Sequence, residues 1–237
     1  MHFKKYLKNI ATHFPIPLTT NEYYDRLTEK IIKKVCNKRA ACIDVGANEG
    51  KILSMFVKHC PFGRHYAFEP IPHLYFSLKR KYGSAVTIYK LALSNHTGES
   101  NFNFVLTDPA YSGLKKRDYD KPEKDEMIQV ETAKLDDIIN PDQPIQLIKL
   151  DIEGGEYNAL SGAVNLLRKH HPTILFEFGK PGAAAYNIST AMMFDFFNEH
   201  QYKIYTMPHF LQQKNPLTLL QFEDCFKHGK PFFFIAH

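Results

Sequence analysis

The sequence predicts an α/β fold in which a mostly parallel sheet carries helices on both faces. In residues 41–57, a short apolar run suited to a buried strand precedes a glycine turn and apolar residues at helical spacing. Residues 145–167 repeat the order of strand, acidic turn and helix. Further strand-like and helical segments alternate through most of the chain, as in folds built from βαβ units.

Length and composition fit one α/β domain of the larger sort, with 237 residues of which 44% are hydrophobic. The net charge of +5 allows an acidic partner without requiring one. No apolar run approaches the ~18 residues of a membrane helix, and the basic N-terminus lacks a signal-peptide core. We therefore expect a cytoplasmic protein. Four cysteines without C-x-x-C or Cys/His spacing favour a reducing compartment and argue against a structural zinc site: Cys36, Cys42, Cys60 and Cys225.

Residues 1–39 are expected to form a helical lead-in and residues 40–237 the ligand-binding domain. Residues 1–18 are basic and apolar, and either pack on their own domain, which we favour, or contact a membrane surface or a partner. The segment from Thr19 to Glu22 resembles a capping box with Thr19 as the N-cap. It predicts a helix laid over the sheet.

The first turn contains Gly46, Ala47, Asn48 and Gly50. It lacks the G-x-G-x-x-G of dinucleotide sites and the G-K-[ST] ending of a P-loop. A G-x-x-x-G turn at a helix start suits a smaller anion, such as the carboxylate of S-adenosylmethionine. Asp44, at the end of the strand, would hold the ammonium group of that ligand. The alternative is an ordinary turn without a ligand.

The second strand, in residues 64–68, ends at Glu69 and Pro70. An acid roughly 20 residues beyond the glycine turn accepts hydrogen bonds from ribose hydroxyls in such folds, which predicts this role for Glu69. A helix follows in residues 74–82, and then a third strand in residues 86–91. By position, the next residues should lie by the adenine ring: Ala92, Leu93 and Ser94.

Residues 94–135 interrupt the alternation of strands and helices. Two strand-like segments, 100–106 and 127–133, flank a polar segment with several prolines and glycines, which predicts a hairpin insertion with a mobile loop near the site. Within it, residues 111–114 either contact the ligand or form part of a solvated loop.

The strand in residues 145–150 leads into Asp151, Glu153 and Glu156. Ligands of open α/β sheets bind outside the carboxyl ends of the strands, so these acids are site candidates. Glu156 has a second explanation, because an acid in the first helical turn complements the helix dipole. One helix is expected to continue through residues 157–167.

The remaining segments complete the sheet. Residues 172–178 predict a buried strand with another acid, Glu177, followed by a Gly/Pro-rich turn in residues 179–184. A helix with a core-facing Met and Phe stripe is expected in residues 192–197. Strands are expected in residues 202–207 and 232–235.

Three stretches together resemble FkbM-type methyltransferases: DVGANEG at residues 44–50, FEP at 68–70 and KLDIEGGEYNALSGA at 149–163. The LDD at 135–137 and PTILFEF at 172–178 also fit, and the resemblance runs from residue 40 to the C-terminus. It implies a Rossmann-like class I fold with a seven-stranded sheet, S-adenosylmethionine as cofactor, and O-methylation of sugars, glycans or natural products.

Carried over to this chain, the resemblance implies a role for each matched position. Asp44, Gly46, Asn48 and Gly50 would hold the methionine end, Glu69 the ribose, and residues 92–94 the adenine. Asp151 and Glu153 would lie beside the methyl group.

Transfer to a hydroxyl also requires a base, for which Asp151, Glu153 and Glu177 are the candidates. The same acids could bind a divalent cation, which we do not favour. The acceptor is expected to be a small molecule or a glycan. A nucleic acid is not expected, because an N-P-P-Y-type tetrapeptide and a basic stripe are missing from the sequence. Two alternatives remain: a Rossmann-like oxidoreductase, against which the missing glycines argue, and a non-catalytic binding module.

Overall fold

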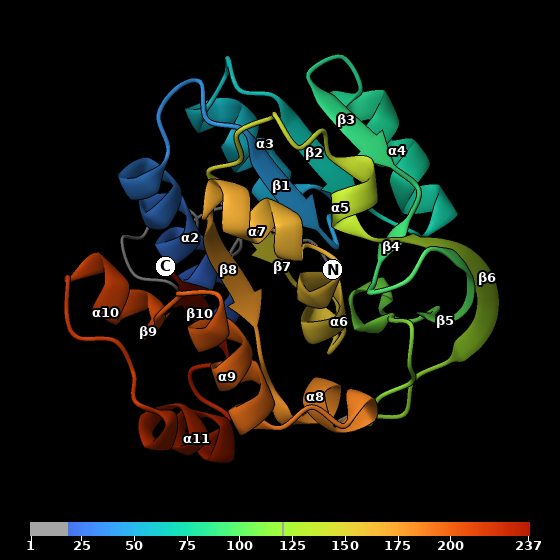
Figure 1. Ribbon diagram of the computed structural model, residues 1–237. Helices are drawn as coiled ribbons and strands as arrows, with labels where there is room; N and C mark the ends of the chain where they lie inside the picture. Colours follow the sequence, from blue (N-terminus) through green and yellow to red (C-terminus); the bar gives the residue numbers. More distant parts are fainter. Residues whose placement is uncertain (1–18, 120) are drawn as a thin grey trace, which may run out of the picture.

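Buried apolar segments form a seven-stranded sheet at the centre of the molecule (Figure 1). The computed structural model describes residues 19–119 and 121–237, so the predicted amphipathic segment in residues 1–18 lies outside the described residues. The strand order is β3-β2-β1-β7-β8-β10-β9, and β10 alone runs antiparallel to its neighbours. The strands are β1 Cys42–Val45, β2 His65–Phe68, β3 Val86–Tyr89, β7 Leu147–Leu150, β8 Thr173–Glu177, β9 Ile204–Thr206 and β10 Phe233–Ala236.

Helices cover both faces of this sheet, which confirms the predicted fold class (Figure 1). One layer consists of α2 Thr20–Val35, α3 Lys51–His59, α4 Pro72–Tyr82 and α10 Met207–Leu211. The other contains α5 Leu135–Ile138, α6 Glu156–Ser161, α7 Val164–His170, α9 Thr190–Glu199 and α11 Leu219–His228. In β1, Ile43 and Val45 pack toward the second layer and Cys42 toward the first. Because parallel strands are covered on both sides, they read as continuous apolar runs rather than alternating ones.

Helix α2 begins where the sequence predicted. The Thr19 side chain accepts a hydrogen bond from the Glu22 N–H at 3.1 Å, which confirms Thr19 as the N-cap. Leu27 and Ile31 pack with Leu175 of β8 and Ile235 of β10, so the helix lies over the sheet as expected.

A smaller sheet carries the predicted hairpin. Strands β5 Gly98–Val105 and β6 Asp125–Ala133 pair antiparallel, and β4 Ala92–Leu93 pairs parallel to β6. The segment between β5 and β6, called the hairpin segment, contains the 3-10 helix η1 Pro109–Tyr111 and turns back onto the hairpin. There the Val105 N–H donates to the Ser112 hydroxyl at 2.9 Å, and Asn103 forms a backbone bridge with Gly113. These bonds hold the segment against strand β5.

The prediction of a single helix through residues 157–167 is wrong. The chain forms α6 and α7 instead, with a break at Gly162 and Ala163. Gly162 packs so closely against Ser94 that an added Cβ would lie 2.2 Å from the Ser94 carbonyl oxygen. The close approach fixes the position of the β4 end against α6.

Four helices were not anticipated: α5, α8 Lys180–Tyr186, α10 and α11. The predicted Gly/Pro turn in residues 179–184 is helix α8, whose Pro181 lies in the first turn, where its fixed φ suits a helix start. Helix α11 begins with a complete capping box between Thr218 and Gln221.

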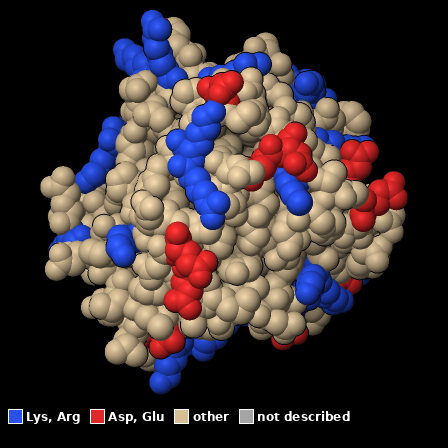
Figure 2. All heavy atoms as spheres, viewed as in Figure 1, with Lys and Arg blue, Asp and Glu red and all other residues tan. Residues whose placement is uncertain are grey.

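Two observations on the described residues concern membranes and surface charge. Among residues 19–119 and 121–237, no helix combines the length and apolarity that crossing a bilayer requires. Figure 2 shows Lys and Arg side chains spread among acidic ones over the face it displays.

Candidate active site

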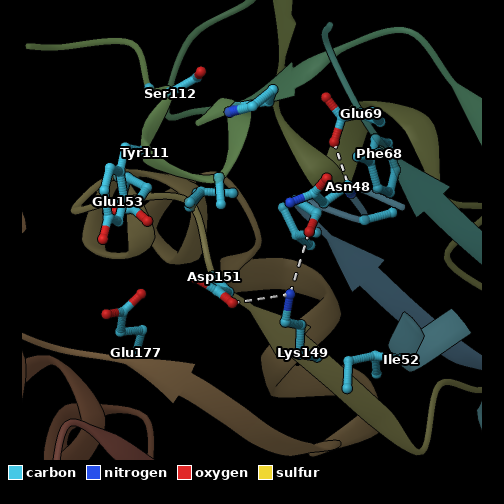
Figure 3. A pocket seen from close by; sticks show the side chains of 18 of the residues that line it. Asn48, Ile52, Phe68, Glu69, Tyr111, Ser112, Lys149, Asp151, Glu153 and Glu177 are labelled. Carbon is cyan, nitrogen blue, oxygen red and sulfur yellow. Dashed lines mark hydrogen bonds and ion pairs between the residues drawn. The ribbon is translucent and has the colours of Figure 1, made fainter. Parts of the chain in front are cut away.

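A cavity of about 820 Å³ opens at the carboxyl ends of β1, β2, β7 and β8 (Figure 3). Strands β2 and β3 lie on one side of β1 and strands β7 and β8 on the other, so the cavity sits at the topological switch point of the sheet. Residues 109–114 of the hairpin segment and the start of α2 contribute further walls. The volume lies in the upper part of the roughly 300–1,000 Å³ range of small-molecule sites.

The glycine turn forms one wall of this cavity. The N–H groups of Gly46 and Ala47 both donate to the Phe68 carbonyl oxygen, at 3.0 and 3.1 Å. Gly46 has a φ of 74°, and an added Cβ would lie 2.1 Å from the Asp151 carbonyl oxygen. A side chain at position 46 is therefore excluded, because the turn packs directly against the backbone at the end of β7.

Glu69 is held in place by the same turn. Its Oε2 accepts the Asn48 N–H at 2.8 Å and its Oε1 accepts the Ile71 N–H at 2.9 Å (Figure 3). Burial raises the pKa of Glu69 to about 7. Each oxygen keeps a second lone pair, so the anchored carboxyl group can accept hydrogen bonds from a ligand.

Lys149 is a buried cation between two carboxylates. Its Nζ lies 3.5 Å from Asp44 Oδ1 and 3.3 Å from Asp151 Oδ2, and donates to the Gly46 carbonyl oxygen at 3.2 Å. Burial alone would lower the pKa of Lys149, but the Asp151 and Asp44 carboxylates raise it above its usual value. The ammonium group thus stays charged and ties the glycine turn to the end of β7.

Three carboxyl groups converge on the cavity from the ends of β7 and β8. One oxygen from each of Asp151, Glu153 and Glu177 lies within 4.8 Å of the other two. Burial alone would raise the pKa of Asp151, but Lys149 lowers it. Burial, together with the Asp151 charge, raises the pKa of Glu177 well above its usual value and that of Glu153 to about 8. Near neutral pH Asp151 is therefore ionised, while the raised pKa values of Glu153 and Glu177 favour the protonated forms of these two groups. Such oxygen ligands could also hold a divalent cation.

Glu153 adopts an uncommon backbone conformation and has its own counter-ion. Its φ is 58°, in the left-handed region that non-glycine residues rarely occupy and that is often found at functional sites. Its Oε2 lies 2.7 Å from Arg117 Nε, and the Arg117 guanidinium stacks on Tyr111 at 4.6 Å. The hairpin segment between β5 and β6 thereby places a cation and an aromatic ring beside the three carboxyl groups.

Glu156 has a structural role. It is buried, and its Oε1 accepts the Ile152 N–H at 2.8 Å, which closes the turn that carries Glu153. Burial raises the pKa of Glu156 to about 7.

The structure brings most of the predicted site residues to this one cavity. Those lining it are Gly46, Ala47, Asn48, Glu69, Pro70, Ala92, Leu93, Asp151, Glu153 and Glu177. Residues 111–114 of the hairpin segment line it as well. Asp44, Gly50 and Ser94 are not among the lining residues, and Asp44 is fully buried behind Lys149.

Sequence reasoning missed two cations of the site. Lys149 was detectable, because it is the one charged residue in the otherwise apolar strand β7. Arg117 lies in a polar segment rich in charged residues and carries no comparable signal.

Comparisons with known proteins identify one matching protein family. The family model for the methyltransferase FkbM domain matches residues 44–204, which include the glycine turn, Glu69 and the three carboxylates. No protein in the comparison with curated sequences matches the chain.

Several solved structures match parts of the chain, each with a TM-score of 0.48 or lower. The methyltransferase FkbM from Methylobacillus flagellatus KT is 22% identical with a TM-score of 0.48; the match covers 71% of this chain and 40% of that one. The precorrin-6y C5,15-methyltransferase from Geobacter metallireducens GS-15 is 12% identical with a TM-score of 0.46, covering 82% and 80%. A SAM-dependent methyltransferase from Aquifex aeolicus is 15% identical with a TM-score of 0.41, covering 75% and 80%.

Proposed function

The chain belongs to the FkbM methyltransferase family, and from that premise we propose that it transfers the methyl group of S-adenosylmethionine to a hydroxyl oxygen of a sugar, glycan or natural product. The observation that carries the proposal is the meeting of the glycine turn, Glu69 and three carboxylates around one cavity.

The cofactor half of the proposal rests on the turn and on Glu69. Gly46 lines the cavity, and Glu69 is oriented by two backbone N–H groups. Because the N–H groups at positions 46–48 are already bonded, the carbonyl oxygens of this turn would hold the ammonium group of the methionine end. Glu69 would hold the ribose hydroxyls, and Ala92 and Leu93 the adenine. Asp44 would act indirectly, through the ion pair that fixes Lys149 under the turn.

S-adenosylmethionine supplies a methyl group on a positively charged sulfur, and transfer to oxygen neutralises that charge. The residues around the reacting atoms have to align the acceptor and remove its proton. Both tasks fall to the carboxyl ends of β7 and β8.

Glu153 is the group we assign as general base. A base works best when its pKa lies near the operating pH, and the pKa of about 8 fits this requirement. Asp151 is a weaker base because its pKa is lowered, and burial together with the Asp151 charge favours the protonated form of Glu177, whose pKa is raised well above the usual range. Asp151 instead holds Lys149, and Glu177 in its protonated form can donate a hydrogen bond to Asp151 or to the acceptor.

A divalent cation is not favoured at this site, because two side chains already supply positive charge. Arg117 lies against Glu153 and Lys149 against Asp151. An added cation would have to compete with both ion pairs for the same carboxylate oxygens.

The acceptor half of the cavity combines aromatic and polar groups. Tyr111 of the hairpin segment, Tyr24 of α2 and Phe232 before β10 line it together with the carboxylates. Aromatic faces pack against the apolar faces of a sugar ring, and carboxylates accept hydrogen bonds from its hydroxyls. This mixture supports a hydroxyl-rich acceptor.

The test is transfer of a labelled methyl group from S-adenosylmethionine into fractionated small molecules and glycans. We expect label in a hydroxyl-bearing fraction with the wild-type chain and with Glu126→Gln, which changes an exposed acid on β6. Glu153→Gln should lose the transfer while retaining binding of S-adenosylhomocysteine. Transfer by Glu153→Gln at the wild-type rate, or label found only on nitrogen or carbon, would contradict the proposal.

A further inference from the structure

We propose that Cys36, Cys42 and Cys60 form a binding site for a thiophilic metal ion, with monovalent copper as the best match and Zn²⁺ as the competing ion. The site is independent of the methyl-transfer chemistry proposed above.

The fold brings these three cysteines together from separate elements. Cys36 is the C-cap residue of α2, Cys42 begins β1, and Cys60 is the C-cap residue of α3. The active-site turn follows the carboxyl end of β1, whereas the cysteine cluster lies at the amino end of this strand, on the opposite side of the sheet from the cavity.

The distances between the sulfur atoms suit one shared ion. Cys36 Sγ and Cys42 Sγ are 3.8 Å apart, and all three Sγ atoms lie within 4.8 Å of one another. With metal–sulfur bonds of about 2.3 Å, two sulfur ligands of one ion are about 3.8 Å apart in a tetrahedral site and about 4.0 Å apart in a trigonal one. The triangle therefore needs only a small contraction to coordinate an ion.

The surroundings of the cluster favour a soft cation. Cys42 and Cys60 are fully buried, and the adjacent side chains include Ile32, Phe56 and Leu147. Thiolate ligands select copper(I) and zinc over hard ions such as Mg²⁺. Two helices, α2 and α3, end at the cluster, and the C-terminal ends of helix dipoles attract positive charge.

The number of donors distinguishes the two ions. Within residues 19–119 and 121–237, the cluster gathers three sulfur atoms and no carboxylate or imidazole. The nearby His65 uses its Nε2 to bond the Cys60 carbonyl oxygen at 2.9 Å. Three thiolates satisfy a trigonal copper(I) ion, whereas Zn²⁺ almost always takes four ligands in structural sites.

Solvent can reach the cysteine cluster, and metal binding there should depend on pH. Cys36 is half-buried and is followed by the exposed residues 37–39, which offers a path from solvent. Coordination replaces the proton of each protonated thiol with the metal, so binding releases protons and strengthens as pH rises.

The experiment uses tag-free, fully reduced protein without oxygen, titrated with copper(I) or Zn²⁺ against a chromophoric competitor. We expect one copper(I) ion per chain, an ultraviolet charge-transfer band, and a higher melting temperature with the ion bound. Affinity should fall at least ~10-fold in Cys36→Ser and in Cys60→Ser, since even outer-shell changes at metal sites cost about 10–100-fold. Cys225→Ser is the matched control, because Cys225 lies in α11, and it should bind as the wild-type chain does.

Three results would overturn the proposal. They are no copper(I) binding by the wild-type chain, unchanged affinity in Cys60→Ser, and an equal loss in Cys225→Ser. Rapid formation of a Cys36–Cys42 disulfide that metal does not prevent would assign the pair to redox chemistry instead. Because the melting temperature is also measured on the wild-type chain, the test does not depend on every variant folding.

Discussion

Replacing Lys149 with methionine tests the electrostatic arrangement that holds the site together. Lys149 and Asp44 have side chains 7% and 1% exposed, so Lys149→Met leaves the Asp44 carboxylate buried without its counter-charge. Breaking a buried ion pair by removing one partner costs roughly 3–5 kcal/mol. Because the Asp151 side chain is 31% exposed, water compensates part of its loss, and we expect about 3 kcal/mol.

The loss should depend on pH in a defined direction. In the wild-type chain, Lys149 lowers the pKa of Asp151, and this contributes stability that is present above the unfolded-state pKa and lost as pH falls through the folded-state pKa. Burial already raises the pKa of Asp44 in the wild-type chain, and without Lys149 it should raise that of Asp44 further and that of Asp151 as well. The variant should then be relatively more stable at pH 5, where these groups can take up protons, than at pH 8.

The assay is urea unfolding at pH 5 and pH 8, with Lys124→Met as a control at an exposed lysine. The double variant Lys149→Met/Asp44→Asn should recover part of the lost free energy, because the uncompensated charge is gone. A loss below about 1 kcal/mol at pH 8, typical of a surface pair, or an equal loss at both pH values would refute the reasoning.

Four further outcomes follow from the site. Glu153→Gln should lower the methyl-transfer rate by roughly 10²–10⁴-fold, which single-turnover kinetics would measure. The wild-type rate should rise with pH and level off above about 8, as Glu153 loses its proton, and Arg117→Met should shift this profile to higher pH. Glu69→Gln should weaken S-adenosylhomocysteine binding by roughly 10–100-fold, the equivalent of hydrogen bonds to a charged acceptor, as seen by calorimetry. EDTA should leave the rate unchanged, and a loss restored by Mg²⁺ would contradict the metal-free assignment.

The sequence was informative where local patterns determine structure. Strand β1, the turn at Gly46 and the acids after β2 and β7 were predicted, because buried parallel strands are short apolar runs and ligands bind at their carboxyl ends. Helix α8 was misread as a turn, because Pro181 and Gly182 look like turn residues although proline is favourable in a first helical turn.

Interactions between distant segments were not predictable in the same way. Arg117 reaches Glu153 from the hairpin segment, and Lys149 of β7 pairs with Asp44 of the adjacent strand β1, which lies far earlier in the chain. The cysteines at positions 36, 42 and 60 are scattered in the sequence, yet their sulfur atoms meet in the fold. Such pairings depend on the register and packing of elements, which single-sequence patterns do not specify.

The central claim is that the cavity between the glycine turn, Glu69 and the β7 end binds S-adenosylmethionine. Titration calorimetry with S-adenosylhomocysteine measures this directly, using the wild-type chain, Glu69→Gln and the surface control Glu126→Gln. The account predicts one molecule bound per chain, unchanged binding in Glu126→Gln and clearly weaker binding in Glu69→Gln. Absence of binding heat in the wild-type chain, or full affinity in Glu69→Gln, would contradict it.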